Sequence, residues 1–399
     1  MKITSVATIS VKEYPNLIWV EVVTDEGLVG LGETFFGADA VVGHIHELAA
    51  PYLLGKDPLN IERHWHELYG YYRSGGIGAE ARACSAIDNS LWDLLGQASG
   101  LPLYALLGGR TREAIRAYNT CAGSSYARDR IKGTLDNDDW SKVQRGAMYE
   151  DLDAFRYRAD ELAASLLEDG FTAMKIWPFD DLAVPSDGMV VLPSDLERGL
   201  APLVKIRDAV GSRIEVAIEM HSRWGLTAAK QIARACEAYE PMWFEDPTRT
   251  ENLQTLVRFA RSTRIPTIAS ELLAGKGHFQ AILESGAFGY LMFDLGWVGG
   301  LTEARKLAAM ADAYDLPFTP HDCTGPVNLA LGVHLGVSQP NAAWQEVVRA
   351  YYHTWYNDVV TGLPELKDGY LYPLTGPGLG LSLDPSVRKR PDASIQVSS

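Results

Sequence analysis

The sequence predicts an α/β protein: a (β/α)8-type barrel, or modified TIM barrel, with an α+β domain at its N-terminus. The barrel is predicted by three apolar runs that each end in a glutamate, Ile214–Glu219, Met242–Glu245 and Thr267–Glu271. By their sequence numbers, both intervals between these glutamates are 26 residues. A strand, a helix and their two loops occupy roughly 25 residues in such a barrel. We therefore expect one carboxylate at the C-terminal end of each of three successive parallel strands.

A second observation is the alternation of strand-like and helical segments over residues 116–360, which we expect to form the barrel. Amphipathic helical periods are clear in Thr227–Cys236 and Leu301–Met310 and weakest in the aromatic segment 351–357. Such alternation is typical of a parallel barrel. The expected strands are 117–121, 173–177, 214–219, 242–245, 267–271, 290–294, 317–321 and 343–347.

Residues 1–115 are expected to form the α+β capping domain. Two runs rich in apolar and β-branched residues, Ile18–Val23 and Leu28–Glu33, flank a turn and indicate a β-meander. Helical periods follow, and the last of them ends at Gly100. The loop-rich segment 361–399 is expected to pack back on this domain and complete it.

Two connections are longer than a barrel needs, Ser124–Glu150 after the first strand and Pro178–Leu192 after the second. Neither shows clear periodicity. Long connections of this kind are usually lids or disordered segments, and both leave the mouth of the barrel, so we expect lids.

Composition excludes several classes of partner. The chain has 399 residues, a net charge of −15 and no Lys/Arg-rich run, which makes nucleic acid and anionic membranes poor partners. No apolar run reaches membrane-spanning length. The four cysteines are widely spaced with no C-x-x-C pair, as expected for reduced thiols in a cytoplasmic protein.

The three glutamates predict a metal site. Glu219, Glu245 and Glu271 would repel one another at the barrel mouth unless a hard divalent cation neutralised them. We expect Mg2+ as the cofactor.

Further side chains follow the other expected strands. Lys175 and Trp177 are two residues apart and should share the inward face, as should Glu219 and His221. Buried beside a metal, Lys175 would hold a substrate carboxylate, and burial could also lower its pKa. The pairs His44/His46 and His64/His66 lie on helical segments, where residues two apart diverge, and are expected to be surface or packing residues.

Asp294, His321 and Glu346 end the sixth, seventh and eighth expected strands. Asp294 and His321 lie on adjacent strands, so a hydrogen bond between them would fix the imidazole tautomer and raise its basicity. Together with the metal site and Lys175, these side chains suit removal of a proton from the carbon next to a carboxylate. His321 would be the base, and the cation, Lys175 and a protonated Glu346 would stabilise the developing enediolate.

These motifs resemble those of a known family. The segment Ser85–Gly109, the glutamate triad, the Asp294–His321 dyad and Glu346 are similar to the signatures of the enolase superfamily, mandelate racemase subgroup. The resemblance covers nearly the whole chain. It implies the cap-and-barrel fold, a small-molecule substrate and a homo-oligomer.

Within the subgroup the chain most resembles galactonate dehydratases, through the segments Glu219–Arg223 and Pro320–Ala330. The resemblance implies that His321 takes the C2 proton of a sugar acid and that His221 protonates the departing 3-OH. The product would be a 2-keto-3-deoxy acid. Lys175, Trp177 and Arg223 would then contact the substrate.

The chain also departs from the family pattern. Its first ligand is Glu219 where the family usually has Asp, and Trp177 stands where mandelate racemase and glucarate dehydratases carry a second lysine. We expect a Mg2+-dependent dehydratase of a mono-carboxylate sugar acid (an aldonate). The alternatives are an acid-sugar cycloisomerase or epimerase acting through the same enediolate, and a non-catalytic barrel that binds a sugar acid.

Overall fold

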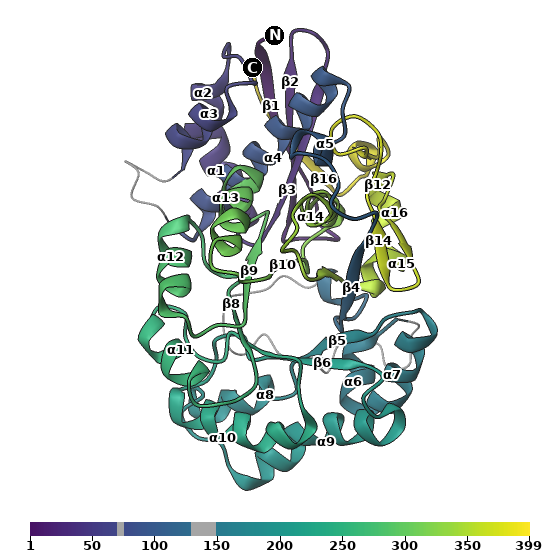
Figure 1. Cartoon of the computed structure of the whole chain (residues 1–399). Helices are drawn as coiled ribbons and strands as arrows, with labels where there is room; N and C mark the ends of the chain where they lie inside the picture. Colours follow the sequence, from purple (N-terminus) through teal and green to yellow (C-terminus); the bar gives the residue numbers. More distant parts are fainter. Residues whose placement is uncertain (70–75, 129–148) are drawn as a thin grey trace.

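The computed structural model describes residues 1–69, 76–128 and 149–399. Most of the first expected lid, Ser124–Glu150, therefore lies outside the described residues. The rest forms a capping domain above a barrel, with the two chain termini close together on the cap (Figure 1).

The cap is built on an antiparallel sheet in the strand order β16-β1-β2-β3. Its strands are β1 (Ile3–Val11), β2 (Leu17–Thr24), β3 (Val29–Phe35) and β16 (Ala393–Ser398). The last strand of the chain thus pairs with the first, Val6 opposite Ser398. The helices of the cap are α1 (Ala38–His44), the π-helical turn η1 (Ile45–Ala49), α2 (Ala50–Leu53), α3 (Ile61–Leu68), α4 (Ala79–Ser99) and α5 (Leu103–Leu106).

Helix α4 joins the cap to the barrel, because it packs on β3 and on α13. It ends where the sequence predicts. Gly100 adopts the left-handed backbone (φ 70°) that terminates helices and that only glycine takes without a side-chain penalty.

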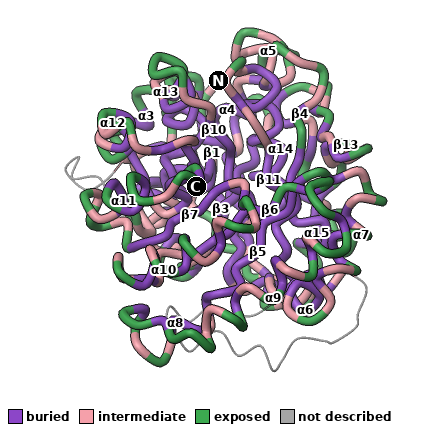
Figure 2. The backbone as a smooth tube through the Cα atoms, turned by 60° about the horizontal axis from the view of Figure 1, so that its bottom comes forward, coloured by how far each residue is buried: buried purple, intermediate pink, exposed green. Residues whose placement is uncertain are grey.

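Among the described residues, eight parallel strands form the barrel, and β11 pairs with β4 beside β5. Bonds between Phe318 and the segment Asn341–Ala343 close the remaining gap between β10 and β11. The strands are buried on both faces, as in other parallel sheets, and Figure 2 shows this burial along the chain. They are β4 (Ile115–Thr120), β5 (Ala173–Ile176), β6 (Glu215–Glu219), β7 (Phe244–Glu245), β8 (Thr267–Ala269), β9 (Tyr290–Asp294), β10 (Phe318–His321) and β11 (Gln345–Val347).

All eight expected strands are present, and several are shorter than predicted. β7 begins at Phe244, although the Met242 N–H still bonds to Val216 O (2.8 Å) in the manner of a parallel ladder. β8 ends at Ala269, so Glu271 lies on the loop that follows the strand.

The barrel helices surround the strands. They are α6 (Asp151–Tyr157), α7 (Ala159–Glu168), α8 (Asp180–Ala183), α9 (Pro193–Val210), α10 (Leu226–Cys236), α11 (Leu253–Ala260), α12 (Lys276–Ser285), α13 (Gly300–Asp312), α14 (Pro326–Ser338), α15 (Arg349–Thr354) and α16 (Tyr356–Val359). Short 3-10 turns are η3 (Tyr126–Arg128), η6 (Val184–Ser186), η7 (Glu237–Tyr239) and η8 (Val387–Lys389). None of the helices in the described ranges is both long and apolar enough to cross a bilayer.

The second long connection, Pro178–Leu192, is not the irregular loop that its sequence indicates. It contains α8 and η6, because Leu182 and Ala183 are buried in the core and anchor the segment. This short helix also fixes Asp180 beside the barrel mouth.

The C-terminal segment contacts both halves of the molecule. Strands β13 (Glu365–Lys367) and β14 (Tyr370–Tyr372) form a hairpin, and β14 pairs antiparallel with the start of β4. Strand β12 (Val360–Thr361) pairs with β15 (Ser382–Leu383). Only β16 enters the sheet of the cap.

Candidate active site

The three glutamates meet at the C-terminal ends of neighbouring strands. Glu219 ends β6, Glu245 ends β7, and Glu271 follows β8 by two residues. One carboxylate oxygen from each lies within 4.8 Å of the others, so the group can hold a metal ion. The Glu219 Oε2 atom is buried and has no hydrogen-bond partner, as expected of a group that supplies a ligand atom. The donors are all carboxylate oxygens, which suit a hard cation.

Charge crowding is strong in this triad. Burial, and next the charge of Glu245, raise the pKa of Glu219 well above its usual value. Burial also acts to raise the pKa of Glu271, but the neighbouring His321 outweighs it, and that pKa is lowered. A divalent cation would relieve the repulsion between the carboxylates.

Lys175 of β5 lies among these carboxylates and is 2% exposed. Its Nζ atom is 2.6 Å from Glu245 Oε1, 2.9 Å from Glu346 Oε1 and 3.7 Å from Glu219 Oε2. Its pKa does not follow from burial alone. Burial acts in that direction, but Glu245 and Glu346 outweigh it and raise the pKa well above the usual value.

Glu346 of β11 is held by donors from β4 and from the residue that follows β10. Tyr118 OH donates to Oε2 (2.8 Å), the Asp322 N–H donates to the same atom (3.2 Å), and Thr120 Oγ1 donates to Oε1. The expected protonated form of Glu346 does not fit these neighbours. Burial acts to raise the pKa of this carboxyl, but Lys175 and His321 lower it, so the group is ionised.

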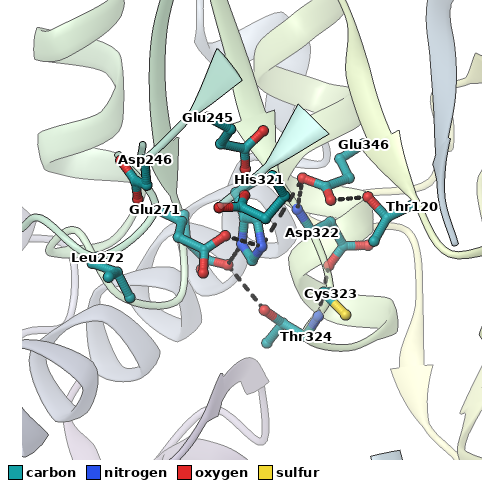
Figure 3. Close-up of polar contacts among 12 residues, drawn as sticks. Thr120, Glu245, Asp246, Glu271, Leu272, His321, Asp322, Cys323, Thr324 and Glu346 are labelled. Carbon is teal, nitrogen blue, oxygen red and sulfur yellow. Dashed lines mark hydrogen bonds and ion pairs between the residues drawn. The ribbon is translucent and has the colours of Figure 1, made fainter. Parts of the chain in front are cut away.

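The predicted hydrogen bond between Asp294 and His321 is present. The two residues stand opposite each other in the β9–β10 ladder, and His321 Nδ1 is 2.7 Å from Asp294 Oδ2. On its other side, His321 Nε2 is 2.8 Å from Glu271 Oε2 and 4.0 Å from Glu346 Oε2. Figure 3 shows His321 between these two glutamates. Burial acts to lower the pKa of His321, but Glu271, Glu346 and Asp294 raise it well above the usual value.

His221 has its own carboxylate partner, which the sequence did not reveal. Its Nδ1 atom is 2.6 Å from Asp180 Oδ2, a buried carboxylate on α8. Strand β6 ends at Glu219, and His221 itself has a left-handed backbone (φ 43°), so its direction comes from a turn and not from strand alternation. Burial acts to lower the pKa of His221, but Asp180 and then Glu271 raise it.

Both histidines face the same hollow. Its volume, including the open space at its mouth, is about 490 Å³. Trp177 meets the His221 ring edge-on at 5.7 Å, and Trp297 packs against the His321 ring at 5.2 Å. Arg223 is not among the residues that line it; its Nε atom is 3.4 Å from Asp180 Oδ2. The lining residues are Phe36, Thr120, Tyr126, Lys175, Trp177, His221, Glu271, Trp297, His321, Cys323 and Glu346.

Several of these residues carry no signal in the sequence. Phe36 comes from the cap, and Tyr126 and Trp297 come from loops after β4 and β9. Asp180 could have been suspected, because it is an acid three residues beyond the end of the predicted strand 173–177. Of the cap histidines, His46 bonds to Thr8 and Ser398, His64 bonds to Tyr52, and His66 is exposed.

Eight parallel strands thus gather a carboxylate triad, a lysine and two carboxylate-bound histidines at one end of a barrel. Residues 158–387 match the family model of the enolase C-terminal domain-like proteins. Residues 2–108 match that of the mandelate racemase / muconate lactonizing enzyme N-terminal domain. The chain belongs to the enolase superfamily, in its mandelate racemase family.

Known relatives and structures resemble the chain over nearly its full length. A D-galactonate dehydratase of Pectobacterium atrosepticum is 33% identical over 96% of this chain and 92% of its own. A D-galactonate dehydratase of Xanthomonas axonopodis pv. citri is 32% identical over 98% of this chain and 94% of its own. The crystal structure of an enolase of the mandelate racemase subgroup from Agrobacterium tumefaciens superposes with a TM-score of 0.88 at 45% identity, covering 100% of this chain and 99% of that one.

Proposed function

We propose that the chain is a sugar-acid dehydratase, a carbon–oxygen hydro-lyase that requires Mg2+ and acts on an aldonate with one carboxylate. The observation that carries this proposal is the pair of histidines, each bonded through Nδ1 to its own carboxylate and both facing the hollow beside the triad. Dehydration needs two proton transfers at neighbouring carbons, and the pair supplies a separate group for each. The D-galactonate dehydratases among the relatives support the substrate class.

The cation site in this proposal is the triad Glu219, Glu245 and Glu271. Bound there, Mg2+ would supply positive charge to the substrate carboxylate and to the negative charge that develops on it. Lys175 contributes a fixed positive charge at the same place, since Glu245 and Glu346 hold its Nζ atom. We assign Lys175 to the substrate carboxylate.

His321 is the base. Asp294 accepts from Nδ1, so Nε2 is the atom that takes the C2 proton. The charge of Glu271 raises the pKa of His321, and a cation held by Glu271 would offset that charge and favour the neutral imidazole that a base requires. The Nε2 atom is the one that lies near Glu271 and Glu346, at the edge of the cation site. The proton therefore leaves the carbon next to the carboxylate, where the negative charge is best stabilised.

His221 is the acid. Asp180 keeps its imidazole in the protonated form, which can donate to the 3-OH of the substrate. The C3–O bond breaks, the hydroxyl leaves as water with the proton of His221, and the electron pair from C2–H forms the C2–C3 double bond. The resulting enol tautomerises to the 2-keto-3-deoxy acid. Arg223 acts on Asp180 and not on the substrate, and Trp177 narrows the pocket beside His221.

The test is a screen of aldonic and aldaric acids, D-galactonate included, with Mg2+ and detection of 2-keto acids by semicarbazide. We expect keto acid from one or a few aldonates and none from aldaric acids. His221→Asn and His321→Asn should both abolish it. If wild type forms no keto acid but exchanges the C2 proton with solvent deuterium, the dehydratase is excluded, and an epimerase or cycloisomerase through the same enediolate takes its place.

A further inference from the structure

Two adjacent residues of the cap, Glu33 and Thr34 of β3, extend toward the barrel without lining the hollow. Both are fully buried. Each bonds to a different segment of the barrel, and both segments hold the same carboxylate, that of Asp294.

The first connection runs through Gly296. Thr34 Oγ1 donates to the Gly296 carbonyl at 2.7 Å. The N–H of Gly296 in turn donates to Asp294 Oδ1 at 2.6 Å. The residue whose N–H holds one oxygen of Asp294 is therefore itself held, through its carbonyl, by the cap.

The second connection runs through the first turn of α14. Glu33 Oε1 accepts from the N–H groups of Val327 (3.1 Å) and Asn328 (3.0 Å), and Trp19 Nε1 donates to Oε2 (2.9 Å). These N–H groups have no partner within the helix, so an acceptor at this position satisfies them and fixes the start of α14. A side chain at Gly325 would place its Cβ 2.4 Å from Glu33 Oε1, so glycine leaves the room that this approach needs.

Helix α14 connects Glu33 to Asp294 and His321. The Asn328 amide Nδ2 is 3.4 Å from Asp294 Oδ2 and 3.3 Å from the His321 carbonyl. Thr324, on the loop before the helix, donates to the same Asp294 oxygen at 2.9 Å. The second oxygen of Asp294 is therefore held by the segment that Glu33 anchors.

We propose that Glu33 and Thr34 are positioning residues for proton abstraction: they fix the two oxygens of Asp294 and, through Asp294, the ring of His321. The proposal rests on the proposed role of His321 as the base. It gives the cap a part in the chemistry in addition to its part in enclosing the pocket. Residues that orient a functional histidine through hydrogen bonds, without touching the substrate, typically contribute roughly 10- to 100-fold to activity.

The kinetic test uses Thr34→Val, which removes the hydroxyl, and Thr34→Ser, which keeps it. We expect Thr34→Val to lower kcat by roughly 10-fold or more with KM little changed, and Thr34→Ser to restore most of the rate. In an Asp294→Asn background, Thr34→Val should add little further loss, because both substitutions act through the same carboxylate. Full additivity would overturn the proposal.

Thr302→Val is the matched control. Thr302 of α13 is also buried, and its Oγ1 accepts from Trp92 of the cap at 2.8 Å, so the variant loses a cap–barrel hydrogen bond that does not lead to Asp294. It should lower the unfolding midpoint about as much as Thr34→Val and leave kcat unchanged. An equal loss of kcat in both variants would show that the role of Thr34 is only structural.

A spectroscopic measurement separates this proposal from the proposed function. In protein labelled with 15N-histidine, the His321 ring resonances are identified by their loss in His321→Asn. We expect Thr34→Val and Glu33→Gln to shift them, Thr302→Val to leave them in place, and the shifts to occur whether or not a substrate is known. Unmoved resonances would overturn the positioning role, whereas moved resonances in a protein that dehydrates no sugar acid would contradict only the proposed function.

Discussion

The Nδ1 atom of His221 lies 2.6 Å from Oδ2 of Asp180, a residue that comes from the loop after the preceding barrel strand. The second histidine of the hollow, His321, bonds to Asp294 in the same way, through its Nδ1 atom. Each histidine thus has a carboxylate that fixes its tautomer and stabilises its cationic form. The acid and the base of the proposed reaction are supported in the same way by carboxylates from different elements, α8 and β9.

Asp180→Asn should move the alkaline limb of the pH–kcat profile to lower pH. The charge of Asp180 raises the pKa of His221, so without that charge the imidazolium loses its proton at lower pH and the acid form is depleted sooner. We also expect kcat at neutral pH to fall by roughly 10²-fold or more. Arg110→Gln, which removes the exposed ion pair with Glu113, is the control and should leave the profile unchanged. An unshifted alkaline limb in Asp180→Asn would contradict the role of His221 as the acid.

Removal of Mg2+ should abolish activity and lower the unfolding midpoint. A cation that binds only the folded protein stabilises it by about 2.7 kcal/mol at a concentration of 100 times its Kd. The measurement is calorimetric unfolding after EDTA treatment, with and without added MgCl2. In Glu219→Gln the added MgCl2 should no longer raise the midpoint, because the buried Oε2 of Glu219 is one of the expected ligand atoms. A normal response to MgCl2 in that variant would place the cation elsewhere.

Lys175→Met should inactivate the protein and destabilise it in the absence of Mg2+. The substitution leaves Glu245 and Glu346 buried without their cationic partner, and losses of about 3–5 kcal/mol are typical when one member of a buried pair is removed. Urea unfolding in EDTA measures the loss, and MgCl2 should recover part of it. Equal stability of the variant and wild type in EDTA would show that the triad and Glu346 do not depend on Lys175 for charge balance.

Trp177→Leu should raise KM and affect kcat less. The indole lines the hollow and meets the His221 ring edge-on, so its loss widens the pocket where the substrate chain would lie. Steady-state kinetics on the substrate found by the screen gives both constants. A change confined to kcat would instead indicate that Trp177 mainly orients His221.

The barrel and most of the site could be predicted because their signals are local. Glu219, Glu245 and Glu271 follow apolar runs at equal spacing, and parallel strands bring such positions together whatever the loops do. The Asp294–His321 bond follows in the same way from adjacent strand ends.

What could not be predicted depends on tertiary contacts. Asp180 reaches His221 only because Leu182 and Ala183 anchor a helix in a segment whose sequence lacks periodicity. The net pKa shift of Lys175 and the charge of Glu346 do not follow from the burial of either residue alone, because the two groups are 2.9 Å apart and stabilise each other's charge. The contacts of Glu33 and Thr34 join segments more than 250 residues apart, which no spacing rule identifies.

The most direct test of the account follows the substrate's C2 proton in D2O by 1H NMR, in wild type, His221→Asn and His321→Asn, with Mg2+ and the aldonate found by the screen. We predict 2-keto-3-deoxy acid from wild type alone. His221→Asn should still exchange the C2 proton for deuterium, because its base is intact, and His321→Asn should show neither exchange nor product. Exchange or product in His321→Asn would contradict the assignment of His321 as the base that begins the reaction.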